Sequence, residues 1–388
     1  MLPVATAPWA RCLAHPRVGP VLVVAVCLLA FFFGLGGHHL LDPDEGRSAE
    51  VAREMLVSGD WLVPTLNFDH FHDKPALYYW LIAASLRLFG AEDWAVRLPG
   101  VLAATASVLC TGLWAGRYLG RLTGCLAAVV LATTLGFIAM GRVVLTDATF
   151  SWWMIAALLY GSAWWMEGAR RGWPPWPFYV LVALATLTKG PAAPILAVLV
   201  FAPFALRTGM PVTIRRMQPG RGALLLLIVA GTWYVAASVA APEYVWNFLW
   251  NHNLRRYTEG RGGHSANVVT FLYLLPAAFL PWSLYFPSAA RVLRHRSRVL
   301  RLSDPLWFCL VWATAVVGFF SFAGSKLVTY VLPAFPPLAI LVAAALSTVV
   351  AQDGDDGISP RSHQRVLGVL VAMSVATTLA LLGFSAVF

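Results

Sequence analysis

The residues best suited to chemistry lie in one polar stretch of this 388-residue chain, Asp42 to Pro75, which reads DPDEGRSAEVAREMLVSGDWLVPTLNFDHFHDKP. Two adjacent acids in it, Asp44 and Glu45, are placed to accept a proton or to position a substrate. Lys74 can neutralise a phosphate group as a compact point charge. The plainer alternatives are acids favoured by a helix dipole and a lysine in a solvated loop.

Further charged or polar residues stand alone beside apolar runs. Arg142 and Asp147, in GRVVLTDATF, bracket the start of one run, and Lys189, in LATLTKGPAAP, lies between two runs. Lys326 and Tyr330, in SKLVTYVLP, are four residues apart, so we expect them to share one helical face. Ordinary interfacial charge and snorkelling side chains are the alternatives for these residues.

A second polar segment spans residues 242–267. It contains the sequence WNHNLRR, with His252, Asn253, Arg255 and Arg256. Arginines are enriched on cytoplasmic loops of membrane proteins. If this segment lies on the other side, its arginines are better explained by a functional role.

The composition indicates a membrane protein. Hydrophobic residues make up 59% of the chain and charged residues 12%, about half the charge of a soluble domain. The apolar runs are too long for barrel strands, so we predict an all-α polytopic integral membrane protein. The net charge of +10 reflects arginines between apolar runs, and no nucleic acid partner is expected. The five cysteines form no CxxC pair and give no redox evidence.

Arginine placement predicts the topology. The connections at 167–174, 207–221 and 289–304 are rich in arginine and should be cytoplasmic, as should the N-terminus and the turn with Arg117 and Arg121. Counting outward from them places the polar groups on the opposite face, together with the cations Lys74, Lys189, Arg255, Arg256 and Lys326. That arrangement suits a lipid substrate with a phosphate headgroup.

About twelve apolar runs can be counted along the chain. The run at 75–90 is short and carries Arg87, so we predict that it does not span the membrane. About eleven transmembrane helices remain, which places the C-terminus outside. These runs lie at 18–37, 98–116, 122–141, 147–166, 174–188, 190–206, 222–241, 268–288, 305–322, 327–350 and 365–387.

We expect one transmembrane domain over residues 1–388, with no soluble C-terminal domain. Residues 42–97 form its first extracytoplasmic loop, with juxtamembrane helices, and 242–267 the second large one. In the first loop, Asp42 is predicted to cap a helix that stops at Gly59. The apolar side of this helix should lie along the membrane surface, and its polar side should hold Arg47, Glu50, Arg53 and Glu54.

Five motifs, in this order, resemble those of lipid-linked-sugar glycosyltransferases of the GT-C fold. They are DPDEGRSAEVAREML…SGDWLVP.LN…DKPALYYWL, LTD, LTKGP, WNHNLRR and SKLVTYVLPAFP, and they cover residues 18–350. The resemblance is to the bacterial aminoarabinose transferase group, which is related to protein O-mannosyltransferases. It implies a GT-C-like fold, a polyprenyl-phosphate sugar donor and an active site on the extracytoplasmic side.

The resemblance and the placement of charges together assign roles to residues; Glu45, Arg47, Arg255 and Arg256 are included for their placement alone. We expect Asp44, Lys74 and Asp147 to be catalytic. Substrate contacts are expected from Glu45, Arg47, Lys189, His252, Asn253, Arg255, Arg256, Lys326 and Tyr330. Among these, Lys74 and Lys326 are predicted to contact a phosphate oxygen.

A divalent metal ion is an open question. The pattern His70-x-His72-Asp73 offers metal donors but no firm fourth ligand. The resemblance implies that a metal can be held between Asp73 and His252. The sequence therefore predicts no cofactor as a firm requirement. A divalent metal ion is the one optional cofactor.

The sequence thus predicts an inverting membrane glycosyltransferase. It would move a sugar from a polyprenyl (undecaprenyl) phosphate to lipid A, another glycan or a protein. Asp44 would orient the sugar or the acceptor if the nucleophile is an ionised phosphate, or act as general base toward a hydroxyl. The resemblance implies the bacterial inner membrane, with the site facing the periplasm. A flippase or transporter for polyprenyl-linked or lipid cargo is the alternative, although repeat symmetry and midplane charge are lacking. A non-catalytic scaffold is a third option.

Overall fold

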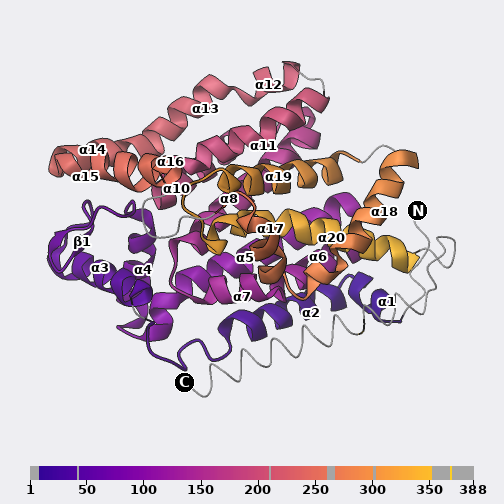
Figure 1. The fold of residues 1–388 in the computed structure, drawn as a ribbon, viewed down its shortest axis with the longest axis horizontal. Coiled ribbons are helices and arrows are strands. Elements are labelled where there is room, and N and C mark those ends of the chain that lie inside the picture. Colours follow the sequence, from indigo (N-terminus) through magenta and orange to yellow (C-terminus); the bar gives the residue numbers. More distant parts are fainter. Residues whose placement is uncertain are drawn as a thin grey trace.

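The computed structural model describes residues 8–41, 43–208, 211–259, 267–299 and 303–351, together with Gly368. These residues are almost entirely helical, and most of the helices run along the long axis of the molecule (Figure 1). The strands in this part of the chain are the two-residue pair β1 (Thr65–Leu66) and β2 (Asp69–His70), joined as an antiparallel hairpin. The predicted all-helical fold is therefore confirmed, and the hairpin is an addition to it.

The central bundle is built from the long apolar helices. Its members are α5 (Asp93–Leu119), α6 (Arg121–Ala132), α7 (Leu135–Arg142), α8 (Thr146–Ala163), α10 (Trp176–Lys189), α11 (Ala192–Thr208), α19 (Asp304–Ser321) and α20 (Phe335–Ala351). The N-terminal segment packs against α6 and consists of α1 (Pro8–Ala14), α2 (Val18–Cys27) and the π-helical turn η1 (Leu28–Phe32).

The remaining elements form connections and the outer layer. After α8 come η2 (Trp164–Gly168) and α9 (Ala169–Arg171). Beyond α11 the chain forms α12 (Pro211–Met217), α13 (Pro219–Leu226), η3 (Leu227–Gly231), α14 (Thr232–Ala240), α15 (Pro242–Trp246), η4 (Asn247–Arg255) and α16 (Arg256–Glu259). Before α20 lie α17 (Thr270–Ala278), η5 (Trp282–Tyr285), α18 (Phe286–Val299) and η6 (Val328–Ala334).

Small residues let the helices of the bundle approach closely. A Cβ atom added to Gly124 of α6 would lie 2.6 Å from the backbone of Gly116 in α5 and 2.5 Å from the carbonyl oxygen of Gly112. No side chain fits in that space. Close backbone contact at glycines replaces the hydrophobic driving force that is missing between helices in lipid.

The described chain holds four helices that are long and apolar enough to cross a membrane, and a fifth if α6 and α7 form one bent span. The four are Asp93–Leu119, Ile214–Ala240, Asp304–Ser321 and Val328–Thr348. The count of about eleven spans stays a prediction. The helix α4 (Leu77–Phe89) has 13 residues, a length of about 20 Å, which is shorter than the hydrocarbon core. Because α10, which was predicted to span, has only 14 residues, length does not separate the two cases, and the prediction that 75–90 does not span stays a prediction.

Two runs that we expected to be continuous are broken. The run at 122–141 bends by 61° between α6 and α7. The run at 268–288 is divided into α17 and η5 around Leu280 and Pro281. Pro281 cannot donate a backbone hydrogen bond, which ends regular helix there. The predicted run at 365–387 lies outside the described residues except for Gly368, so the position of the C-terminus is untested.

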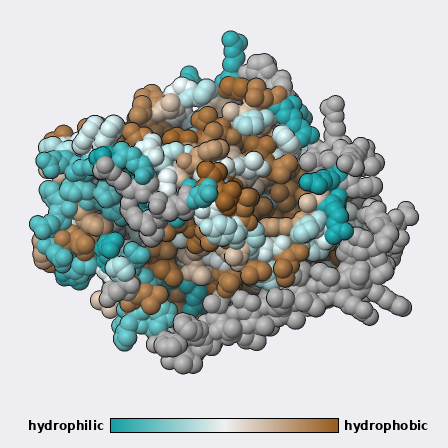
Figure 2. Space-filling view, viewed as in Figure 1, coloured by the Kyte–Doolittle hydropathy of each residue, from teal (hydrophilic) through white to brown (hydrophobic). Residues whose placement is uncertain are grey.

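Predicted cytoplasmic segments meet at one end of the bundle. Glu167 accepts hydrogen bonds from Arg117 Nε at 2.5 Å and from Tyr118 Oη at 2.6 Å, and pairs with Arg171 Nε at 3.3 Å. The described N-terminal helix and α18 lie toward this end, whereas α3 (Asp44–Ser58), β1 and α15 lie at the other (Figure 1). Figure 2 shows hydrophilic residues gathered at the end of α3 and β1 and hydrophobic residues across the middle.

The first loop folds as α3, the hairpin and α4. Helix α3 ends at Gly59, whose left-handed conformation (φ 72°) allows its N–H to bond Met55, as predicted. Pro43 occupies the N-cap position of the described helix without a side-chain cap hydrogen bond, and the predicted cap, Asp42, lies outside the described residues. One prediction was wrong: Glu54 is fully buried rather than on the polar face. It accepts hydrogen bonds from Thr65 Oγ1 at 2.5 Å and the backbone of Phe68 at 3.1 Å, which ties the hairpin to α3.

Candidate active site

A cavity of about 870 Å³ lies at the end of the bundle that holds α3 and η4. It collects residues from five separate segments of the chain, which the sequence had placed on one membrane face. The predicted site residues among its lining are Asp44, Arg47, Asp73, Lys74, Asp147, Lys189, His252, Asn253, Arg256 and Tyr330.

Lys74 is held in one wall by its neighbours. Its ammonium lies 2.9 Å from Asp73 Oδ1, and Tyr244 Oη donates a hydrogen bond to its carbonyl oxygen. His252 Nδ1, from η4, lies 3.1 Å from the same oxygen of Asp73. Burial opposes ionisation of Asp73, but the hydrogen bond from His252 and the charge of Lys74 outweigh it and lower the pKa of Asp73. Asp73 therefore stays ionised and fixes Lys74 in the cavity.

The Asp73–His252 pair was a candidate metal site, and its geometry tests the fit. The described part of the chain contains no group of three or more His, Cys, Asp or Glu side chains arranged to hold a metal. The Lys74 ammonium lies 2.9 Å from Asp73 Oδ1, the same oxygen that faces His252. His70 and His72 contact each other at a centroid distance of 6.2 Å instead of converging on Asp73. As arranged, these donors do not fit a metal ion.

Asp147 and Lys189 form an ion pair at the back of the cavity. Asp147 lies in the first turn of α8 and Lys189 in the last turn of α10, positions at which helix dipoles favour these charges. Their side chains are only 10% and 13% exposed. The Lys189 ammonium also lies 4.3 Å from the ring centroid of Tyr330. The sequence predicted both residues but not their contact.

The glycine after Lys189 allows close packing in this wall of the cavity. Gly190 has a φ of 95°, and an added Cβ atom would lie 2.7 Å from Phe248 and 3.2 Å from Asn253 Oδ1. Asn253 is itself held by a hydrogen bond from its Nδ2 to the carbonyl oxygen of Phe248, at 2.8 Å. The Lys-Gly pair thus lets η4 pack against the end of α10.

Asp44 is the most accessible of the cavity acids. Its side chain is 62% exposed, and Arg47 of the same helix lies 3.6 Å away. At that distance no hydrogen bond joins the two. Asp44 is therefore open to a ligand, as the catalytic assignment requires.

The lining charges leave a surplus of positive charge. Four cations, Arg47, Lys74, Lys189 and Arg256, face three carboxylates, Asp44, Asp73 and Asp147. Lys74 and Lys189 are paired with acids, whereas Nε of Arg256 is buried and has no hydrogen-bond partner within the described residues. A buried donor without a partner favours an incoming acceptor such as a phosphate oxygen.

Three predicted substrate contacts do not line this cavity. Glu45 is fully buried beside Arg97, and Arg255 pairs with Glu259 at 3.1 Å. Lys326 is 7% exposed and donates to the carbonyl oxygen of Ala323 at 2.5 Å. The phosphate contact predicted for Lys326 stays a prediction.

The predicted common helical face of Lys326 and Tyr330 was also wrong. The helix here is the 3₁₀ helix η6, which begins after Lys326, at Val328. In a 3₁₀ helix the side chains repeat every three residues, so a spacing of four does not align them.

Sequence reasoning missed several residues of the site. Thr329 lines the cavity with a buried hydroxyl that has no partner among the described residues. Tyr244 supports Lys74, and Arg97 binds Glu45 from within α5. A lone arginine in the first turns of an apolar helix was the available signal for Arg97.

Sequence comparison identifies relatives. Residues 73–235 match the family model described as dolichyl-phosphate-mannose-protein mannosyltransferase. The undecaprenyl phosphate-alpha-4-amino-4-deoxy-L-arabinose arabinosyl transferase of Shewanella sediminis is 32% identical over 331 residues, which are 84% of this chain and 59% of that protein. A protein of the same name from Pseudomonas aeruginosa (strain UCBPP-PA14) is 33% identical over 334 residues, 82% of this chain and 58% of the relative. The chain thus spans about three fifths of the length of these curated relatives.

Solved structures share the fold. The crystal structure of ArnT from Cupriavidus metallidurans bound to undecaprenyl phosphate matches with a TM-score of 0.79 at 30% identity, over 92% of this chain and 64% of that one. The oligosaccharyltransferase of Archaeoglobus fulgidus matches with a TM-score of 0.64 at 14% identity, over 96% and 56% of the two chains, a likeness of fold alone. These similarities support the resemblance seen in the motifs: the chain is similar to aminoarabinose transferases over most of its length and shares their GT-C-like helical fold.

Proposed function

We propose that this protein is a membrane glycosyltransferase that takes a sugar from a polyprenyl phosphate. The observation that carries the proposal is the cavity itself. It combines an accessible carboxylate, Asp44, with the cations Lys74, Lys189 and Arg256 at one end of an apolar helical bundle. A lipid phosphate enters such a site from the membrane, and a sugar attached to it reaches the acid.

The cations supply the chemistry of the leaving group. In the proposed reaction the bond between the anomeric carbon and the phosphate oxygen breaks, and the electron pair leaves with the polyprenyl phosphate. Lys74 and Arg256 stabilise the charge that develops on that phosphate. The related ArnT was crystallised with undecaprenyl phosphate, which supports undecaprenyl phosphate as the lipid carrier in this protein as well.

The acceptor oxygen forms the new bond to the anomeric carbon from the opposite side, so the anomeric configuration inverts. Asp44 takes the proton if the acceptor is a hydroxyl group, and orients sugar or acceptor if the nucleophile is an ionised phosphate. The names of the relatives favour 4-amino-4-deoxy-L-arabinose as the sugar. Lipid A, another glycan and a protein remain the acceptor classes to test.

The proposed location follows from the topology. The arginine-rich segments around Arg117 and Arg171 would face the cytoplasm, and the cavity would face the periplasm from the bacterial inner membrane. The donor would then be used on the side where lipid A and envelope glycans are found.

The test is a transfer assay. Purified protein in lipid nanodiscs is incubated with undecaprenyl-phosphate aminoarabinose and with lipid A or an oligosaccharide, and the products are identified by mass spectrometry. We expect a glycosylated acceptor and free undecaprenyl phosphate in equal amounts. Movement of intact donor across a liposome membrane without any glycosylated product would favour the transporter alternative and overturn the proposal.

A further inference from the structure

We propose that Arg97 and Glu45 act as a buried positioning pair that sets the positions of two of the three cavity acids, Asp44 and Asp147. The inference rests on the proposed glycosyl transfer and adds positioning residues to that site. Neither Arg97 nor Glu45 lines the cavity, and both are at most 2% exposed. Any effect on the reaction must therefore pass through the segments that they hold.

Arg97 ties the end of the first apolar segment to α5. Its Nη1 donates to the carbonyl oxygens of Leu35 and His38, both at 2.9 Å, and its Nη2 donates to that of His39 at 2.9 Å. Its Nε and Nη2 bind the two oxygens of Glu45, at 3.2 and 2.8 Å. The planar fork of a guanidinium makes this many directed contacts, which a lysine cannot make.

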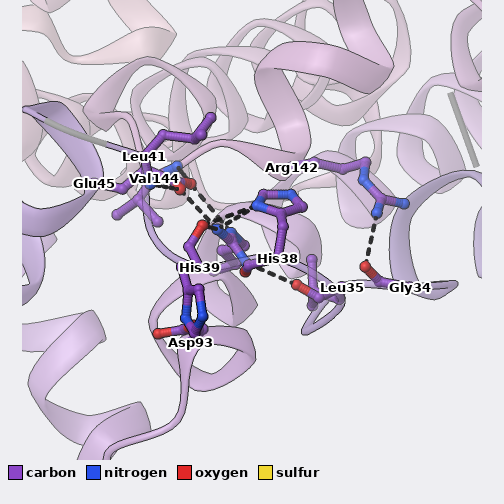
Figure 3. Close-up of polar contacts among 10 residues, drawn as sticks. Gly34, Leu35, His38, His39, Leu41, Glu45, Asp93, Arg142 and Val144 are labelled. Carbon is purple, nitrogen blue, oxygen red and sulfur yellow. Dashed lines mark hydrogen bonds and ion pairs between the residues drawn. The ribbon is translucent and has the colours of Figure 1, made fainter. Parts of the chain in front are cut away.

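Glu45 joins two further segments to that arginine. Its Oε2 accepts a hydrogen bond from the backbone N–H of Leu41 at 2.8 Å, and its Oε1 accepts one from Val144 at 2.9 Å. Figure 3 shows these groups converging on one carboxylate. A buried carboxylate with four donors is fully satisfied, so it fixes its partners in one arrangement.

The two tied segments carry the cavity acids. Asp44 is the residue directly before Glu45, and Val144 lies three residues before Asp147 in the extended connection that starts α8. Val144, Leu145 and Thr146 themselves line the cavity. A shift of Glu45 therefore moves the acid on α3 and the acid on α8 relative to each other.

The substitution Glu45→Gln isolates this role because it preserves side-chain shape. Each carboxylate oxygen accepts from one N–H of Arg97 and one backbone N–H. An amide replaces one oxygen with an NH₂ group, which cannot accept and faces those donors. Two of the four hydrogen bonds are lost in either orientation of the amide.

Glu54→Gln is the matched control. Glu54 lies on the same helix, is equally buried and accepts hydrogen bonds from Thr65 and Phe68 of the hairpin. It does not line the cavity and makes none of its hydrogen bonds to the segments that hold the acids. A loss of stability that E45Q and E54Q share is then the cost of replacing any buried carboxylate on this helix by an amide.

The experiment compares E45Q, R97K and E54Q with the wild type by kcat, KM for donor, undecaprenyl phosphate binding and Tm. We expect E45Q and R97K to lower kcat about tenfold to a hundredfold, since small misplacements of reacting groups have effects of that size. KM for donor and binding of undecaprenyl phosphate should stay within about twofold, because the Lys74 wall is held by other contacts. E54Q should keep its kcat at a comparable loss of Tm.

Hydrogen–deuterium exchange gives a readout without any activity. E45Q should speed exchange in the peptide that contains Val144, whereas E54Q should not. Unchanged exchange at Val144, or equal kcat in E45Q and E54Q, overturns the inference. A wild-type protein without transfer activity would instead overturn the proposed function, and the exchange result would still decide the positioning role.

Discussion

Lys189 donates a hydrogen bond to the carboxylate of Asp147, so that two charges 42 residues apart in the chain neutralise each other at the cavity wall. Both side chains are almost buried. The ammonium also faces the ring of Tyr330, at 4.3 Å from its centroid, which stabilises its charge from a third segment. The pair thus joins α8, α10 and η6 at the cavity wall.

Removing one partner of this pair should cost stability. Lys189→Met leaves Asp147 buried without its cation, and we expect it to lose about 3–5 kcal/mol of folding stability. Asp147→Asn combined with Lys189→Met should recover part of that loss because no charge remains unpaired. Thermal unfolding in detergent measures both effects. Transfer activity should stay low in the double variant, and full activity there would show that the pair only supports the fold.

Lys74 should act on the leaving phosphate. Lys74→Ala removes a charge-assisted hydrogen bond of about 1.5–3 kcal/mol, which is about ten- to a hundredfold in kcat. Lys74→Arg should rescue little because the planar guanidinium does not fit the place of a compact ammonium beside Asp73. Steady-state kinetics at equal protein levels check this. Near wild-type kcat in both variants would assign Lys74 a purely structural role.

The neighbouring arginines of η4 and α16 give a matched comparison. Arg256 lines the cavity, whereas Arg255 pairs with Glu259 on the surface. We expect Arg256→Ala to weaken binding of undecaprenyl phosphate about tenfold or more and Arg255→Ala to leave it nearly unchanged. Isothermal titration calorimetry in nanodiscs measures both. Equal losses of affinity in the two variants would mean that lying in the cavity lining does not decide which arginine binds the phosphate.

The pH dependence of stability should report on Glu45. Burial opposes its ionisation, but hydrogen bonds from Arg97, Leu41 and Val144 together with the Arg97 charge lower the pKa of Glu45. A carboxyl whose pKa is lower in the folded state stabilises the fold above its unfolded pKa of about 4.3. That stability is lost as the pH falls through the folded pKa. Tm should therefore fall more steeply below about pH 4 in the wild type than in E45Q, and parallel curves would contradict this.

Much of the site was predictable because its residues are charged in an apolar chain. Asp44, Lys74, Asp147 and Lys189 stand out from the apolar runs, and arginine placement put them on one face. Charge is costly in lipid, so an isolated charge signals either function or an interface. The fold class followed from the length of the apolar runs for the same reason.

The sequence predictions that were wrong depended on how the chain folds around a residue. Lys326 and Tyr330 were expected on one helical face, but the helix here is 3₁₀ and begins after Lys326, at Val328. Glu54 matched the polar face of α3, yet the hairpin covers it with hydrogen-bond donors. Periodicity describes one helix at a time and cannot show what a folded loop places against it.

The most direct test of the central claim compares binding and turnover in Asp44→Asn. The cavity cations bind the lipid phosphate in this account, and Asp44 acts on the sugar or its acceptor. The variant should therefore bind undecaprenyl phosphate with an affinity within about twofold of wild type. Its single-turnover transfer rate should fall about a hundredfold or more, the size of a lost general base. Transfer at the wild-type rate by a folded Asp44→Asn protein would contradict the account.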